Sequence, residues 1–264
     1  MRRDGFTLIE LLVVIAVIAL LVALSATASR IARENARAVR CASNVRQLCM
    51  ALSIYQTNNE TFPYGFRFAL SPPPGGYVGD HTCDKPGFWW FNYAGEIYKE
   101  ADGRDSIACC PSKRLDRTFS SENVLRANYT VNQSVCKSYS TSRLSDEEFF
   151  GTPLGLGEMP NPSRTLLVAD GGYAVTNWHH VADVPPVALG SRIEDASYIP
   201  GIEINKGKFI WQDQKRDAIL GRHLNRTVNA GFVDGSVRRV KAEELAVAKD
   251  DDGYRNRRPL WTPK

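Results

Sequence analysis

The sequence has little net charge and no cluster of one sign. Among its 264 residues, 33 Lys and Arg stand against 29 Asp and Glu, which gives +4 at pH 7. Nucleic-acid-binding domains usually concentrate basic residues on one face, so we expect no nucleic acid as a partner. Hydrophobic residues make up 43% of the chain, which excludes wholesale disorder and allows a sizeable core.

Motifs of the common enzyme classes are also absent. The sequence contains no Gly-x-Ser-x-Gly, no phosphate-binding loop and no His-Glu-x-x-His. These patterns place a nucleophile, a nucleotide phosphate or a pair of zinc ligands. From the sequence we therefore expect a protein that is not an enzyme and holds no cofactor.

Glycine and proline are missing between Phe6 and Thr61, and the first part of this stretch is almost free of charge. Residues 6–24 read FTLIELLVVIAVIALLVAL, with Glu10 as the one charged side chain. A helix over these residues is about 28 Å long, close to the thickness of the hydrocarbon core of a bilayer. Since no comparable run follows, we expect a single membrane-spanning helix.

An ordinary secretory signal explains this run less well. Such a signal has an apolar region of about 7–15 residues followed by a small-x-small cleavage site. Here the apolar run is longer, and Ser25–Ser29 resembles a cleavage site only if the preceding segment is ignored. Glu10 is a further difference, because an acidic side chain within a membrane helix is costly and indicates a function.

The segment Gly5–Ile15, GFTLIELLVVI, resembles the N-terminal signal of type IV prepilins and type II secretion pseudopilins. The resemblance implies that a prepilin peptidase cleaves between Gly5 and Phe6 and methylates the new amino terminus of Phe6. It also implies other pilin-like subunits and an inner-membrane secretion platform as partners. The chain would then be a structural subunit of a type II secretion pseudopilus or a related type IV filament.

Glu10 is expected to act in filament assembly. Cleavage leaves a positive amine on Phe6, and a carboxylate from a subunit shifted along the filament axis can neutralise it where the dielectric is low. In the alternative interpretation, Glu10 lies one turn from the start of the helix and merely reaches back to the lipid headgroups.

Two indications of membrane orientation disagree. Arg2 and Arg3 precede the span, and four arginines follow it: Arg30, Arg33, Arg37 and Arg40. A count of positive flanks places the C-terminal side in the cytoplasm. The prepilin resemblance implies the reverse, with the N-terminus inside and the globular domain in the periplasm. We follow the resemblance because its motif is far more specific.

The helix is expected to continue beyond the membrane. Apolar residues recur at spacings of three, four and seven: Ile31, Val39, Ala42, Val45, Leu48, Cys49, Leu52 and Tyr55. This pattern predicts an amphipathic helix whose apolar stripe packs on a globular domain. We divide the chain into a leader peptide (1–5), a transmembrane helix (6–29), an amphipathic helix extension (30–59) and an external domain (60–264).

The predicted fold class is α+β, with the long N-terminal helix packed on an antiparallel sheet in a loop-rich domain. Short strands are predicted at Asn128–Val131, Thr165–Ala169, Val228–Val233 and Ser236–Val240, and a brief helix at Glu243–Lys249. Asp234-Gly235 lies between the last two strands, which is a strong signal for a hairpin turn.

The C-terminal part carries a second resemblance. Arg222-His223, followed by VNAGFVDGSV at 228–237, is similar to the His-x9-Asp-Gly ending of a large prepilin-like group abundant in planctomycetes and their relatives. Supporting segments are Cys110–Ser112, Asn128–Asn132 and Pro162–Gly171. Ten residues separate His223 from Asp234 here, which implies a one-residue insertion or bulge. We predict that these two residues form a structural pair across the hairpin.

The cysteines of the external domain are expected to form disulfides, because thiols outside the cytoplasmic membrane tend to be oxidised. The candidates are Cys83, Cys109, Cys110 and Cys136. A bond between adjacent cysteines strains the intervening peptide, so Cys136 is expected to pair with one member of the adjacent pair and Cys83 with the other. Cys41 and Cys49 are too far apart on one helix to bond and are expected to be core thiols.

No metal site is expected. The sequence contains no Cys-x2-Cys, which disfavours zinc. The histidines, His81, His179, His180 and His223, are predicted to be isolated polar residues in loops. Asp250–Asp252 resembles a fragment of a calcium loop, but the EF-hand spacing is missing and a solvated acidic run is expected.

The segment Trp89-Trp90-Phe91, with Tyr93, forms a dense aromatic patch that we expect in the core. Exposure of Trp89 or Trp90 would instead suit sugar or partner binding. The alternative function is therefore a membrane-tethered carbohydrate- or surface-binding protein that uses the prepilin export route without forming a filament.

Overall fold

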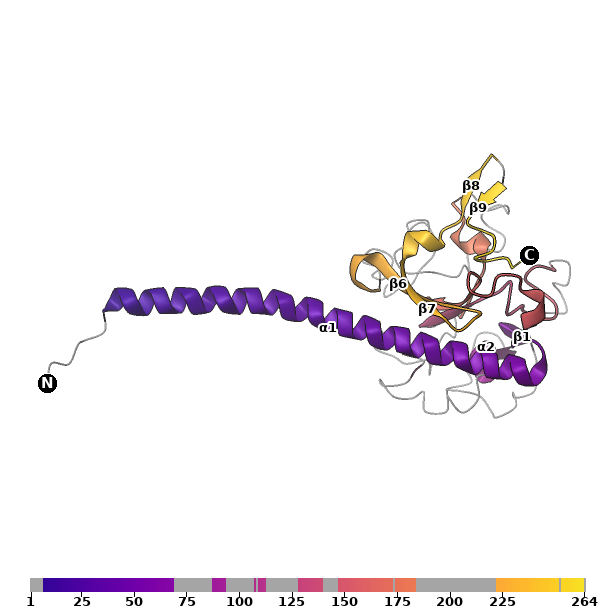
Figure 1. The fold of residues 1–264 in the computed structure, drawn as a ribbon, viewed down its shortest axis with the longest axis horizontal. Helices are drawn as coiled ribbons and strands as arrows, with labels where there is room; N and C mark the ends of the chain where they lie inside the picture. Colours follow the sequence, from indigo (N-terminus) through magenta and orange to yellow (C-terminus); the bar gives the residue numbers. More distant parts are fainter. Residues whose placement is uncertain are drawn as a thin grey trace.

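The computed structural model describes residues 7–68, 87–93, 107, 109–112, 128–139, 147–172, 174–183, 222–251 and 253–263. Helix α1 (Leu8–Asn59) projects from a globular domain, and its second half lies along that domain (Figure 1). One long N-terminal helix followed by a sheet domain is an α+β architecture, as the sequence predicted, and is consistent with the pilin-like fold.

Helix α1 has a defined beginning and end. The Thr7 hydroxyl accepts a hydrogen bond from the backbone N–H of Glu10, and the Glu10 carboxylate accepts one from the backbone N–H of Thr7. This reciprocal cap satisfies two N–H groups that have no partner within a helix. At the other end Glu60 adopts a left-handed conformation with φ of 67°, which stops the helix before Pro63.

The first half of α1 is surrounded by no other described part of the chain. All residues from Thr7 to Ala28 are exposed. The most apolar 18-residue window of the helix has none of its residues buried in the molecule. A helix that is apolar on all sides and has no protein around it fits a membrane span.

The second half of α1 buries a stripe against the sheet. The buried residues are Ala38, Cys41, Asn44, Val45, Leu48, Cys49, Ala51 and Leu52. The predicted stripe is right from Val45 to Leu52, but Val39 is 68% exposed. Ala38 and Cys41 take its place because they lie seven residues before Val45 and Leu48, on the same face of the helix.

The central sheet has the strand order β5-β3-β4-β6-β7. Its strands are β3 (Tyr129–Asn132), β4 (Leu166–Asp170), β5 (Val175–Thr176), β6 (Thr227–Phe232) and β7 (Val237–Lys241). The pairs β3–β4, β4–β6 and β6–β7 are antiparallel, whereas β3 and β5 run parallel. The sheet is thus mixed at one edge, where only antiparallel pairing was predicted.

The predicted β6–β7 hairpin is confirmed. Val228 pairs with Val240 and Gly231 with Val237. Gly235 supplies the positive φ of 80° that the turn requires, and the Asp234 carboxylate accepts a hydrogen bond from the backbone N–H of Ser236.

The predicted helix at Glu243–Lys249 is wrong in its second half. A short 3-10 helix, η6 (Ala242–Leu245), ends before the backbone N–H of Val247 donates to the carbonyl of Val181. The chain then forms the hairpin of β8 (Ala248–Asp250) and β9 (Gly253–Arg255). The tertiary contact of Val247 therefore overrides the local helical tendency.

Smaller elements complete the domain. They are β1 (Phe66–Phe68), β2 (Gly87–Trp89), α2 (Trp90–Tyr93), η2 (Leu156–Glu158), η3 (Trp178–Val181) and η5 (Leu224–Arg226). Strands β1 and β2 pair antiparallel and lie near the end of α1 (Figure 1).

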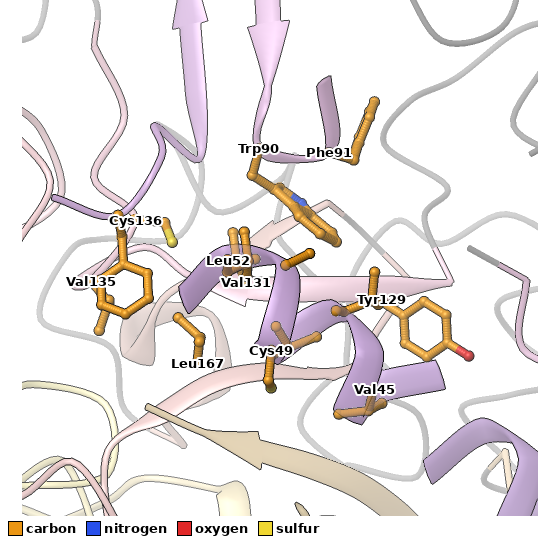
Figure 2. Close-up of a cluster of buried hydrophobic side chains, with 14 of the residues drawn as sticks. Val45, Cys49, Leu52, Trp90, Phe91, Tyr129, Val131, Val135, Cys136 and Leu167 are labelled. Carbon is orange, nitrogen blue, oxygen red and sulfur yellow. The ribbon is translucent and has the colours of Figure 1, made fainter. Parts of the chain in front are cut away.

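Apolar side chains cover both faces of the sheet. On one face, Cys49 and Leu52 of α1 belong to the same core cluster as Val131, Leu167 and Trp90, as Figure 2 shows. On the other face, a second cluster gathers residues such as Leu166, Phe232, Leu245 and Trp261. The domain therefore has three layers, with α1 on one side of the sheet and the C-terminal segment on the other.

Helix α1 approaches β6 very closely. A Cβ atom added at Gly231 would lie 2.4 Å from Cys49 Sγ and 2.8 Å from Val45 Cγ1. Glycine at this position lets the helix rest directly on the strand.

Candidate functional site

The N-terminal segment presents one acidic side chain at the start of an exposed apolar helix. The predicted cleavage and methylation residues, Gly5 and Phe6, lie outside the described residues. Glu10 is exposed, and its carboxylate accepts hydrogen bonds from the Thr7 backbone N–H (2.9 Å) and hydroxyl (2.7 Å). These bonds direct the carboxylate back toward the N-terminal end of the helix.

The predicted disulfide of Cys136 is wrong. Cys110 and Cys136 are both free thiols, so Cys136 bonds neither member of the adjacent pair, and Cys83 lies outside the described residues. Cys136 is buried in the same core cluster as Cys49 of α1. Burial raises the pKa of both thiols, that of Cys49 to about 12.

The predicted pair of His223 and Asp234 is also wrong. His223 Nε2 lies 3.1 Å from Asp170 Oδ2, and both side chains are fully buried. Asp170 is the last residue of β4, and His223 precedes the neighbouring antiparallel strand β6. The two therefore meet at the edge of the sheet where these two inner strands end or begin. Asp234 follows the opposite end of β6 and lies in an exposed turn.

Four buried side chains from distant parts of the chain meet at this edge. They are Cys41 of α1, Cys110, Asp170 and His223, whose Sγ, carboxylate and imidazole atoms lie within 4.8 Å of one another. Cys41 Sγ donates to Asp170 Oδ1 at 2.8 Å, and Cys110 Sγ lies 4.0 Å from His223 Nε2. We refer to these four residues as the edge cluster. Sulfur, oxygen and nitrogen atoms of this kind are metal ligands.

Polar groups surround the edge cluster. The Tyr129 hydroxyl lies 3.4 Å from Cys41 Sγ, and Asn44 Nδ2 donates to that hydroxyl at 3.2 Å. The backbone N–H of Asn229 donates to Asp170 Oδ2 at 2.8 Å. Arg222 donates to the carbonyls of Asn128 and Gly171, next to Asp170.

These contacts set the charges of the edge cluster. Burial opposes ionisation of Cys110, but hydrogen bonds from Cys41 and His223 and the charge of Arg222 lower its pKa to about 6. Burial opposes protonation of His223, but the adjacent Asp170 carboxylate raises the pKa of His223 to about 10. The pKa of Asp170 is lowered against its burial, chiefly by His223. Burial raises the pKa of the Cys41 thiol.

The other predicted candidates do not join this cluster. His179 packs edge-on against Phe149 and Trp178, and His180 Nδ1 accepts from the backbone N–H of Asn177. His81 lies outside the described residues. Asp250 and Asp251 belong to β8 and the turn after it and are exposed, while Asp252 lies outside the described residues.

The aromatic patch is part of the core where its side chains are described. Trp90 is 0% and Phe91 3% exposed, and the Trp90 indole donates to the carbonyl of Ala174. The side chains of Trp89 and Tyr93 are not among those described. Trp90 and Phe91 therefore offer no exposed platform for a sugar, and the binding-protein alternative is not favoured.

Comparison with known proteins bears on the N-terminus. The family model described as the prokaryotic N-terminal methylation motif matches residues 1–26. The chain carries a prepilin signal. Together with the long apolar helix, this signal fits a type IV prepilin- or pseudopilin-like protein anchored in a membrane by a single pass. It implies processing by a prepilin peptidase and pilin-like assembly. No curated protein and no solved structure matches the chain.

For this prepilin-like chain, sequence reasoning missed the edge cluster. More than fifty residues separate each member from the next along the chain, so they form no short metal-ligand motif that could be recognised in the sequence. A usable signal was present, because Cys110, Asp170 and His223 each belong to a segment of the second resemblance. Only the sheet topology and the position of α1 bring them to Cys41.

Proposed function

We propose that this protein is a structural subunit of a pilin-like filament, namely a type II secretion pseudopilus or a related type IV filament. In this proposal a prepilin peptidase cleaves between Gly5 and Phe6 and methylates Phe6. The N-terminus starts in the cytoplasm, and the globular domain lies in the periplasm until the inner-membrane platform moves the subunit into the filament.

The observation that carries the proposal is the exposed first half of α1. It is apolar, capped, and surrounded by no described part of its own chain, so neighbouring copies or lipid must cover it. Glu10 is the one acidic side chain in this segment, and among the described residues Thr7 holds its carboxylate. A neighbouring subunit's amine, in a low-dielectric setting, is a stronger partner than a threonine hydroxyl.

We further propose that the protein is not an enzyme. Cys110, His223 and Asp170 superficially resemble a Cys–His–Asp triad, but a triad uses opposite imidazole nitrogens for the nucleophile and the acid. Here both Cys110 Sγ and Asp170 Oδ2 approach the same Nε2. The group is also buried, which leaves a substrate no access.

The first test is the intact mass of the protein purified from membranes, with and without a prepilin peptidase. We expect an N-terminus at N-methylated Phe6 only when the peptidase is present. A Gly5→Val variant should remain full length. A mass that starts near Ser29 would show ordinary signal cleavage and would overturn the proposal.

The second test separates a filament subunit from a tethered monomer. Glu10→Ala should be inserted and processed but should lose self-association, measured by cross-linking in membranes. Thr27→Ala, a polar change in the same exposed half of α1, is the matched control and should associate normally. Equal cross-linking of the two variants would contradict a filament role for Glu10.

A further inference from the structure

The edge cluster offers four donor atoms of the types that bind zinc. Zn²⁺ takes Cys, His and Asp ligands in a tetrahedral shell, with Zn–S near ~2.3 Å and Zn–N or Zn–O near ~2.0–2.2 Å. Such a shell separates its donor atoms by about 3.3–3.8 Å. The separations here are 2.8, 3.1 and 4.0 Å for three of the pairs, and all pairs are within 4.8 Å. Shifts of about 1 Å or less convert the cluster into a coordination shell.

We propose a structural zinc site that holds helix α1 against the sheet domain. Its ligands are Cys41, Cys110, Asp170 and His223. Cys41 comes from α1, whereas the other three ligands come from the globular domain. All four positions are filled by protein, so no position is left open for a substrate, as in structural rather than catalytic zinc sites.

The orientation of His223 supports this site. Nε2 faces the other three ligands, while Nδ1 lies 3.7 Å from Glu34 Oε1. Zinc-bound histidines usually direct their second nitrogen to a carboxylate or carbonyl, which orients the ring. Glu34 is itself held by a hydrogen bond from the hydroxyl of Ser112, two residues after Cys110.

Hydrogen bonding alone does not account for the cluster. His223 Nε2 lies 3.1 Å from both Asp170 Oδ2 and Asn229 Nδ2. The first contact requires a proton on Nε2 and the second requires a lone pair, so both cannot be satisfied. In the metal-free chain Nε2 therefore satisfies only one of these two neighbours, whereas a zinc ion would bind the Nε2 lone pair and the Asp170 carboxylate together.

The charges also match a zinc ion. Two thiolates, one carboxylate and a neutral imidazole around Zn²⁺ carry a net charge of −1. Arg222, which is buried beside Asp170, carries the compensating positive charge. Each thiol or imidazolium proton present before binding is released to solvent as the ion enters.

The competing fate of the two thiols is oxidation. Cys41 and Cys110 Sγ lie within 4.8 Å of each other, and an oxidising compartment favours a disulfide. Zinc would keep both as thiolates. The zinc-bound state contains the metal and, once the metal is removed, is two hydrogen atoms heavier than the disulfide, so elemental analysis and intact mass of one preparation distinguish the two states.

The test uses the full chain purified in detergent under mild reduction, incubated with zinc chloride and desalted. Elemental analysis should find about one zinc ion per chain. Cys41→Ser and Cys110→Ser should each lower the zinc content about tenfold or more. Cys49→Ala removes a buried thiol of the same helix that lies outside the cluster, and it should retain the zinc.

A second set of measurements tests the zinc site even if the cysteine variants fail to fold. The unmodified chain loaded with Co²⁺ should show the thiolate-to-cobalt absorption and the intense visible bands of a tetrahedral site. Glu34→Gln, a partly exposed change that leaves all four ligands intact, should weaken zinc binding about 10–100-fold. Glu60→Gln, at the far end of α1, is its control.

Three results would overturn the proposal. They are a folded, reduced chain without bound zinc, a zinc content equal in Cys110→Ser and Cys49→Ala, and a Cys41–Cys110 disulfide in metal-free protein isolated from the periplasm. The proposal does not depend on filament assembly, so it stands or fails separately from Glu10.

Discussion

The two halves of helix α1 share one continuous backbone but differ in what surrounds it. Leu20 is 61% exposed, whereas Leu48, on the same helix, is 0% exposed. The first half is apolar on every side, and the second half is apolar on the side that faces the sheet. The helix therefore forms from local sequence, but each half is stabilised by a different partner. The first half depends on lipid or neighbouring subunits, and the second half depends on the sheet.

The largest expected effect comes from truncating the buried half. Leu48→Ala should lower the free energy of unfolding of the globular domain by about 2–5 kcal/mol, because it leaves a cavity between α1 and the sheet. Leu20→Ala, the same change in the exposed half, should alter it by less than about 0.5 kcal/mol. Denaturant unfolding in detergent, followed by near-ultraviolet circular dichroism, measures both. Similar losses in the two variants would contradict the conclusion that the sheet stabilises the second half of α1 alone.

An intermediate effect is expected where α1 touches β6. Gly231→Ala should cost about 1–3 kcal/mol of unfolding free energy, because its Cβ would collide with Cys49 Sγ and Val45 Cγ1. Gly157→Ala, whose Cβ would meet no atom within 4 Å, is the control. Adding Cys49→Ala to Gly231→Ala should restore part of the loss, since it removes the nearest atom. If the double variant is no more stable than Gly231→Ala, the contact with Cys49 is not the cause.

The smallest effect is expected on the outer face of the buried half. Ile54 is 58% exposed although it lies two residues from the buried Leu52. Ile54→Ser should change the unfolding free energy by less than about 0.5 kcal/mol. Leu52→Ala, measured in the same way, should cost about 2–5 kcal/mol. A large loss in Ile54→Ser would show that this face also packs within the domain.

Much of the fold could be predicted from local patterns. The helix lacks glycine and proline, and the β6–β7 hairpin has alternating apolar residues on both sides of Asp234-Gly235. Both features depend on neighbouring residues only, so periodicity and turn chemistry were sufficient. The failures were non-local. The backbone N–H of Val247 donates to the carbonyl of Val181 instead of continuing a helix, and β5 joins the sheet edge in parallel.

The candidate sites also divide into a local one, which the sequence reveals, and a non-local one, which it does not. The processing signal is contiguous, so Gly5, Phe6 and Glu10 are recognisable in the sequence, although the first two lie outside the described residues. His223 cannot be assigned a partner in this way, because the sequence contains many acidic residues and does not show which of them contacts the imidazole. The sequence favoured Asp234 across the hairpin, whereas the antiparallel pairing of β4 and β6 brings Asp170 instead.

The amino-acid sequence is sufficient to predict a prepilin signal, one apolar helix long enough to span a bilayer, and an α+β domain after it. These properties follow from contiguous residue patterns, which act through local backbone geometry and total apolar length. The sequence does not predict that four residues share one buried position, namely Cys41, Cys110, Asp170 and His223. Their proximity arises from the packing of α1 on the sheet and from strand order, and neither is encoded at a fixed spacing along the chain.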